Sequence, residues 1–177
     1  MKKKHEYLII TLLLTYSLYC SLIIGASWDE FYHYKNGDNI FEYIFSLGLK
    51  EYQSANFTFH YGLYDFLASF FSKNFTKNLI VESHHIFNLL FSISSIYAIY
   101  QISKILFNKQ IAKISFLLCF LNPIYFGHFS INPKDTIISF CYSWIFYSVL
   151  KYFKNFENSK KRLNHKIFLT ILLTLGL

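Results

Sequence analysis

The chain has 177 residues, of which 54% are hydrophobic and only 15% are charged, and its formal net charge is +7 at pH 7. Several charge-free stretches approach the roughly 20 residues that a helix needs to cross a bilayer, so the composition excludes an ordinary soluble domain. No segment shows the alternating apolar and polar pattern of a membrane-barrel strand. The predicted fold class is therefore all-α, a multi-pass transmembrane helical protein.

The apolar runs predict four complete membrane spans and a fifth that begins near residue 167, at 7–25, 83–103, 113–129, 135–153 and 167–177. The fifth run falls well short of the roughly 20 residues of a full crossing, so we expect a truncated chain, the N-terminal part of a longer protein. A cleavable signal peptide is the alternative for the first span, because small residues follow it. Its apolar run is longer than the roughly 7 to 15 residues of a typical signal core.

Basic residues alternate with acidic residues from one side of the membrane to the other. Lys and Arg concentrate before the first span, between the second and third, and between the fourth and fifth, whereas most acids lie in the other connections. Because cytoplasmic flanks carry the excess of Lys and Arg, we expect a cytoplasmic N-terminus in a bacterial inner (plasma) membrane. Charges alternating across a bilayer provide no single basic face, so we expect no nucleic-acid partner.

The loop 28–80, expected on the external side, contains two amphipathic segments. In the first, apolar residues recur at helical spacing over 40–47, with Asn39 as a plausible N-cap and Glu42 in the third helical position. In the second, Asp65 and two serines lie opposite an apolar face. Both helices are too short to span, so we expect juxtamembrane helices in the outer interface that cover the region beside Asp29. A small extramembrane domain is the alternative.

Charged residues occur at two predicted external corners. Asp29 and Glu30 directly follow the first span, and carboxylates at a membrane edge are costly unless they have partners, which favours a functional site. Lys134 and Asp135 precede the fourth span. An asparagine and a proline just before them suit a helix start, so helix capping explains Asp135 on its own. The other interpretation is that both corners face one site.

These features together resemble a known family. The Asp-Glu pair, the two interfacial helices, the His-Tyr-Gly-Leu-Tyr stretch at 60–64 and the Asn-Pro-Lys-Asp sequence at 132–135 resemble polyprenyl-phosphate-dependent glycosyltransferases of the GT-C class. The resemblance is to family 39, the protein-mannosyltransferase-like and aminoarabinose-transferase-like enzymes, in their N-terminal portion. It implies inverting transfer of a sugar from a polyprenyl-phosphate-linked donor to an acceptor on the outer face. Asp29 then matches the general base, and Asp135 the acid of the second external loop.

The residues themselves can support such chemistry. Inversion in one displacement needs one carboxylate to take the proton of the attacking group, and a departing phosphate needs cationic or hydrogen-bonding stabilisation. Asp29 can supply the first, Lys134 and two histidines the second, while Glu30 holds the acceptor or nearby cations. Many relatives have prolines after the His or Lys of the first loop, where this chain has Tyr61 and Gly62 after His60. The predicted site comprises catalytic Asp29, Glu30 and Asp135 and substrate-binding His33, His60, Tyr64, His128 and Lys134.

Three alternatives remain at this stage. A divalent metal site is conceivable from five external histidines and three acids, but no two of these histidines fall four residues apart on one helix, and we predict neither metal nor cofactor beyond the lipid-linked donor. A secondary transporter with carboxylates at its external gate is a second possibility, although no span has an acid or a Gly or Pro break at its middle. The third is a non-catalytic membrane subunit or a truncated fragment. The sequence indicates no oligomeric state.

Overall fold

The computed structural model describes residues 3–51, 62–75, 79–154 and 159–176, and all regular structure within these ranges is α-helical. The helices in chain order are α1 (Lys3–Ile23), α2 (Glu30–Phe45), α3 (Gly62–Phe75), α4 (Ile80–Leu106), α5 (Lys109–Phe120), α6 (Pro123–His128), α7 (Pro133–Lys154) and α8 (Ser159–Gly176). The all-α prediction is confirmed. Among the described residues, Lys4–Ile23 and Ile80–Leu106 are long and apolar enough to cross a membrane.

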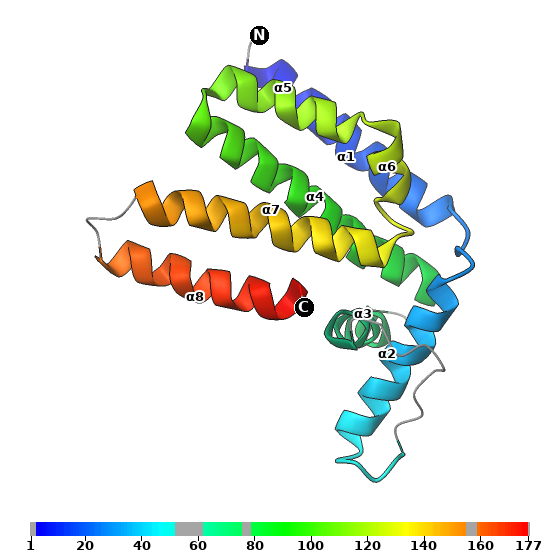
Figure 1. Ribbon diagram of the computed structural model, residues 1–177. Coiled ribbons are helices and arrows are strands. Elements are labelled where there is room, and N and C mark those ends of the chain that lie inside the picture. The colour runs from blue at the N-terminus through cyan, green and yellow to red at the C-terminus, as the bar shows by residue number, and fades with distance from the viewer. Residues whose placement is uncertain (1–2, 52–61, 76–78, 155–158, 177) are drawn as a thin grey trace.

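Helix α4 forms the centre of the molecule (Figure 1). It packs against α1, α3, α5 and α7, while α8 packs on the outside of α7 and α2 packs on α3. Small side chains on α4 permit this close approach, because Ser95 and Ala98 are fully buried. Two clusters of buried apolar residues flank α4: Tyr64, Ala68, Ile137 and Cys141 toward α3 and α7, and Leu89, Ile96, Phe120 and Phe129 toward α5 and α6.

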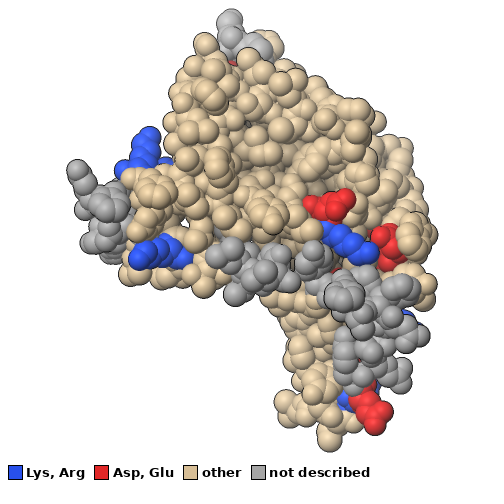
Figure 2. Space-filling view, viewed as in Figure 1, with Lys and Arg blue, Asp and Glu red and all other residues tan. Residues whose placement is uncertain are grey.

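The helical body has two distinct ends. The start of α1, the α4–α5 connection, the end of α7 and the start of α8 lie at one end, and the α1–α2 and α6–α7 connections lie at the other (Figure 1). Figure 2 shows Lys and Arg atoms at the first end, and acidic and basic atoms side by side at the second, near the start of α7. We call this second end the acidic end. The arrangement places Asp29 and Lys134 at the same end.

The apolar run 113–129 contains two helices rather than one. Helix α5 ends at Phe120, and the short α6 begins at Pro123. Pro123 has no N–H to continue the helix but suits the first helical position, and the Asn122 side chain accepts the Tyr125 N–H at 3.0 Å. The division therefore follows from a local helix-start signal inside the apolar run.

Helix α2 begins earlier than its expected cap. The prediction that Asn39 starts the helix is wrong, because α2 starts at Glu30 and Asn39 lies within it. An acid in the first turn suits the positive end of the helix dipole, and Asp29 occupies the N-cap position. The α1–α2 connection is therefore a short turn, which fixes where α2 leaves the helical body.

Helix α3 turns its polar face toward the protein. Asp65, Ser69 and Ser72 are buried, whereas Leu63 and Phe70 are exposed. Helix α2 approaches this face at Gly37, where a β-carbon would collide with the Asp65 carbonyl oxygen and the Ser69 hydroxyl. The outward apolar face is the one that an interfacial helix presents to lipid.

Gly37→Ala tests this close approach. Helix propensity alone would favour alanine by about 1 kcal/mol. The collision should outweigh that gain, because forcing atoms into a packed contact costs about 1–3 kcal/mol. We expect a lower thermal unfolding midpoint for the detergent-purified protein. Gly127→Ala in α6 is the matched control, since open space surrounds that position. A Gly37→Ala variant as stable as Gly127→Ala would contradict the packing.

Candidate active site

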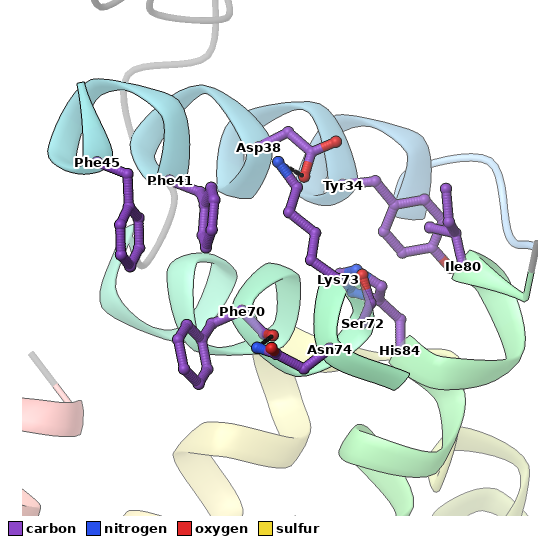
Figure 3. Close-up of a pocket in the computed structure, with 10 residues that line it drawn as sticks. All are labelled: Tyr34, Asp38, Phe41, Phe45, Phe70, Ser72, Lys73, Asn74, Ile80 and His84. Atoms are coloured by element: carbon purple, nitrogen blue, oxygen red, sulfur yellow. Dashed lines mark hydrogen bonds and ion pairs between the residues drawn. The ribbon is translucent and has the colours of Figure 1, made fainter. Parts of the chain in front are cut away.

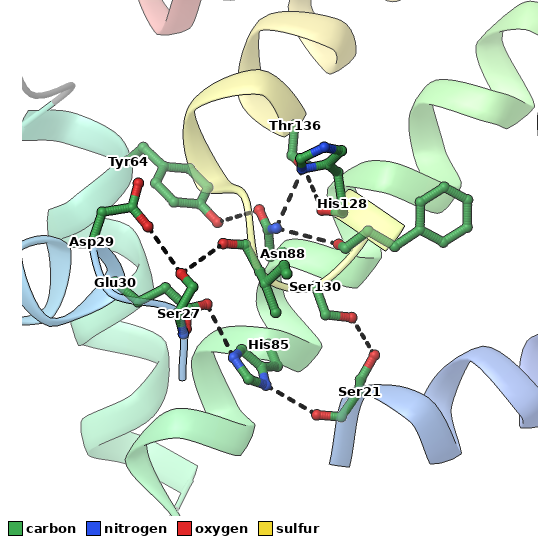
Figure 4. A network of polar contacts seen from close by, with 12 residues as sticks. Ser21, Ser27, Asp29, Glu30, Tyr64, His85, Asn88, His128, Ser130 and Thr136 are labelled. Carbon is green, nitrogen blue, oxygen red and sulfur yellow. Dashed lines mark hydrogen bonds and ion pairs between the residues drawn. The ribbon is translucent and has the colours of Figure 1, made fainter. Parts of the chain in front are cut away.

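The corner between α1 and α2 is held by hydrogen bonds of Ser27 (Figure 4). Its backbone N–H donates to Glu30 Oε2 at 2.6 Å, and its hydroxyl donates to Asp29 Oδ1 at 2.9 Å. The same hydroxyl lies 3.4 Å from the Ile131 carbonyl oxygen in the α6–α7 loop. Ser27 therefore orients both acids and connects their corner to the segment that precedes α7.

Lys134, in the corner between α6 and α7, lies close to Asp29, in the corner between α1 and α2. Its Nζ lies 3.9 Å from Asp29 Oδ2, and the two side chains are 38% and 29% exposed, respectively. The expected proximity of these two corners is thus present in the structure. Asp29 is partly open to solvent and faces a cation across the gap, whereas Glu30, the adjacent acid, is 2% exposed. Neighbouring carboxylates therefore occupy different environments.

Asp135 and His128 share Asn132 as a partner at the start of α7. The Asn132 amide group donates to Asp135 Oδ2 at 2.8 Å, and its oxygen accepts the Asp135 N–H at 3.2 Å, which is a reciprocal cap at the start of α7. The amide nitrogen also lies 3.1 Å from His128 Nδ1. Because an amide NH₂ can only donate, Nδ1 accepts and Nε2 of the neutral ring carries the proton. Exposed His128 can thus donate to a ligand.

Beneath the corner, Glu30 is bonded to a histidine of α4. Glu30 Oε1 lies 3.0 Å from His85 Nε2, and His85 Nδ1 lies 3.0 Å from the Ser21 carbonyl oxygen near the end of α1. His85 is completely buried. The Ser21 hydroxyl in turn bonds the hydroxyl of Ser130 in the α6–α7 loop. These contacts join α1 and α4 to the α1–α2 and α6–α7 corners.

A second polar group holds α3 and the α7 start against α4. The Tyr64 hydroxyl donates to Asn88 Oδ1 at 2.8 Å, and Asn88 Nδ2 donates to the Phe129 carbonyl oxygen at 3.2 Å and lies 3.3 Å from Thr136 Oγ1. The Ser92 hydroxyl also donates to the Phe129 carbonyl at 2.9 Å. Satisfied buried networks of this kind rigidify the elements that they connect.

The predicted site residues thus divide into two sets. Asp29, Lys134, Asp135 and His128 lie at the two corners, and Glu30 lies beside Asp29 with its carboxylate buried against His85. His33 is buried between α2 and α3, with Nδ1 2.8 Å from Asp65 Oδ1, and Tyr64 is part of the Asn88 network. His60 lies outside the described residues. Sequence reasoning missed His85 and Asn88, although one signal was available: polar residues recur at helical spacing along the second span, at His85, Asn88, Ser92 and Ser95.

A groove of about 590 Å³ opens between α2, α3 and the start of α4 (Figure 3). Its described lining residues are Tyr34, Asp38, Phe41, Phe45, Phe70, Ser72, Lys73, Asn74, Ile80 and His84, which include none of the corner residues. Lys73 pairs with Asp38 at 3.2 Å, so its charge is compensated. At the inner end of the groove, the Tyr34 and His84 rings pack together, with their centroids 4.3 Å apart. Burial and the Glu30 carboxylate raise the pKa of the Tyr34 hydroxyl above its ordinary value.

The histidine–acid contacts in the described part of the chain are two separate pairs, His33 with Asp65 and His85 with Glu30. No group of three or more His, Cys, Asp or Glu side chains among these residues is placed to hold a metal ion. The acidic end instead offers a partly exposed carboxylate close to a lysine, and an exposed histidine donor at the end of α6. This set is suited to moving a proton and to contacting an anion.

The fold defines an all-α membrane protein with Asp29 and Lys134 close together at the acidic end. Comparison with known families is more specific. The profile of the dolichyl-phosphate-mannose-protein mannosyltransferase family matches residues 63–177. The chain belongs to this family, and is therefore a membrane glycosyltransferase of the GT-C type. The match includes Lys134 and Asp135 and begins after Asp29. Comparisons with curated proteins and with solved structures gave no match.

Asn88→Leu tests the network that supports the α7 start. The substitution leaves the buried Tyr64 hydroxyl without its acceptor, which should destabilise the protein by about 1–3 kcal/mol. Adding Tyr64→Phe removes the stranded hydroxyl, so the double variant should be more stable than Asn88→Leu alone. Thermal unfolding of the purified variants measures both effects. Strictly additive losses would show that the two side chains are not coupled.

Proposed function

We propose that this enzyme transfers a sugar from a polyprenyl-phosphate donor to an acceptor hydroxyl or amine on the outer face, with inversion at the anomeric carbon. The observation that carries the proposal is the meeting of Asp29 and Lys134 across two external corners in a chain of this family. Asp29 is partly exposed. The Ser27 hydroxyl bonds its Oδ1, whereas Oδ2 is not bonded by Ser27 and faces Lys134. It is therefore the carboxylate best placed to receive a proton.

The proposed reaction is a single displacement. The acceptor oxygen or nitrogen forms a bond to the anomeric carbon while the bond from that carbon to the phosphate oxygen breaks, and the bonding electrons leave with polyprenyl phosphate. Asp29 takes the acceptor proton as general base. Lys134 Nζ and His128 Nε2–H stabilise the charge that develops on the departing phosphate, so the reaction requires no metal ion. Asp135 holds Asn132, and through it the orientation of His128.

The proposed membrane topology agrees with this chemistry. A bacterial inner membrane would be crossed or entered by α1, α4, α5 with α6, α7 and α8. The N-terminus and the α4–α5 connection, at the end opposite the acidic end, would lie in the cytoplasm. The distribution of Lys residues at the opposite end from Asp29 supports this orientation. Helices α2 and α3 would lie in the outer interface, and the acidic end would face the lipid-linked donor.

Asp29→Asn tests the base directly. Membranes that contain the protein would be given polyprenyl-phosphate mannose, glucose or aminoarabinose labelled in the sugar, and release of polyprenyl phosphate and labelled product would be followed. We expect the wild type to use at least one donor and Asp29→Asn to lose about 10² to 10⁴-fold in rate. Asp38→Asn, an acid on the same helix that pairs with Lys73, is the matched control and should keep its rate. Unchanged transfer by Asp29→Asn, or no turnover of any donor by the wild type, would contradict the proposal.

Lys134 substitutions separate charge from shape at the leaving group. Lys134→Ala should lower the transfer rate by roughly 10- to 10³-fold, because a positioned donor is lost where negative charge develops. Lys134→Arg retains the charge on a different head group, and we expect it to recover part of the loss. The measurement is the single-turnover rate with the donor preferred by the wild type. Equal rates for Lys134→Ala and wild type would remove the lysine from the proposed mechanism.

A further inference from the structure

We propose that His85 is a positioning residue, which holds the Asp29 corner in place through a buried pair with Glu30 that shares one proton. The inference rests on the proposed function of Asp29. It assigns Glu30 a role different from that of the adjacent acid: Glu30 does not contact the substrate but orients the residue that does.

The hydrogen bonds of His85 determine how many protons the pair carries. Its Nδ1 faces the Ser21 carbonyl oxygen, which can only accept, so Nδ1 carries a proton. Its Nε2 faces a carboxylate oxygen of Glu30. One further proton must lie between these two atoms, either on the imidazole or on the carboxyl group. In both cases the pair is neutral overall, which permits its complete burial.

The contact between His85 and the end of α1 has a clear physical reason. The Ser21 carbonyl belongs to the last turn of a helix, where carbonyl groups lack a partner from the following turn. A histidine N–H directed at that carbonyl caps α1 and interacts favourably with the negative end of its dipole. The single side chain of His85 therefore fixes both the end of α1 and the start of α2.

The second oxygen of Glu30 passes this constraint on to Asp29. Glu30 Oε2 accepts the Ser27 N–H at 2.6 Å, and the Ser27 hydroxyl donates to Asp29 Oδ1 at 2.9 Å. Both carboxylate oxygens of Glu30 are thus engaged inside the protein, while Asp29 retains an oxygen directed toward Lys134. A continuous series of hydrogen bonds runs from rigid α4 to the proposed general base.

The test combines transfer kinetics with hydrogen–deuterium exchange of the backbone amides in 24–32, measured on the full-length protein in nanodiscs. His85→Ala and Glu30→Ala should accelerate exchange of this segment at least about tenfold and lower kcat by roughly 10²-fold with little change in KM, as expected for a misplaced catalytic group. Glu30→Gln should recover most of both losses. Glutamine can donate its N–H to neutral Nε2 of His85 while its oxygen accepts the Ser27 N–H.

Two controls match these variants. His84→Ala removes the neighbouring buried histidine, which contacts Tyr34 instead of Glu30, and Glu42→Gln makes the same change at an exposed position of α2. Both should retain wild-type exchange of 24–32. If Glu30→Ala fails to accumulate, Glu30→Gln compared with His85→Ala provides the same contrast.

The outcomes separate this inference from the proposed function. Wild-type exchange and rate in His85→Ala would overturn the positioning role. So would a Glu30→Gln variant with protected amides and the low rate of Asp29→Asn, because Glu30 would then act directly in the chemistry. Full transfer by Asp29→Asn would refute Asp29 as the base, whereas the exchange results would still show whether His85 and Glu30 hold the corner.

Discussion

The pairing of Glu30 with His85 determines how the rest of the acidic end is arranged. A carboxylate buried among apolar helices is costly unless its charge is compensated and its oxygens are bonded, and Glu30 meets both conditions through His85 and the Ser27 amide. His85 comes from α4 and also bonds the Ser21 carbonyl of α1, while Ser27 lies between α1 and α2. Satisfying one carboxylate therefore fixes the direction in which α2 leaves the body. The Ser21–Ser130 and Asn88–Phe129 contacts then secure the α6–α7 loop against the same helices.

Two adjacent acids thus have different environments and different proposed tasks. Glu30 is enclosed and structural, while Asp29 is partly exposed, lies near Lys134 and is available for proton transfer. A single displacement requires that the base, the acceptor and the leaving group are aligned at the same time. The hydrogen bonds from His85 through Glu30 and Ser27 would hold the proposed base, Asp29, in a fixed position. The family match assigns the chain to membrane glycosyltransferases, and the geometry adds a specific proposal for which residues act.

The sequence predicted the helical class, two amphipathic helices after the first span and the proximity of Asp29 to Lys134, because apolar run lengths and charge alternation depend on the bilayer and not on details of packing. It failed where local signals or tertiary partners decided the structure. Asn122 and Pro123 start a new helix inside an apolar run that was predicted as one span. Asn39, which was predicted as an N-cap, lies within a helix that starts at Glu30. The burial of Asp65 depends on α2 crossing at Gly37, which a single-helix pattern cannot reveal. His85 was considered only as a conceivable metal ligand or interfacial polar group, because its partners Glu30 and Ser21 are distant in sequence.

The central claim, that the α1–α2 corner and the α6–α7 corner form one site, can be tested most directly by cross-linking in the membrane. In a background where Cys20, Cys119 and Cys141 are replaced by alanine, Asp29→Cys combined with Lys134→Cys should be joined rapidly by a short bifunctional thiol reagent. Asp29→Cys combined with Asn108→Cys, at the opposite end of the helical body, should not. Failure of the first pair to cross-link while both thiols remain reactive, or equal cross-linking of the two pairs, would contradict the account.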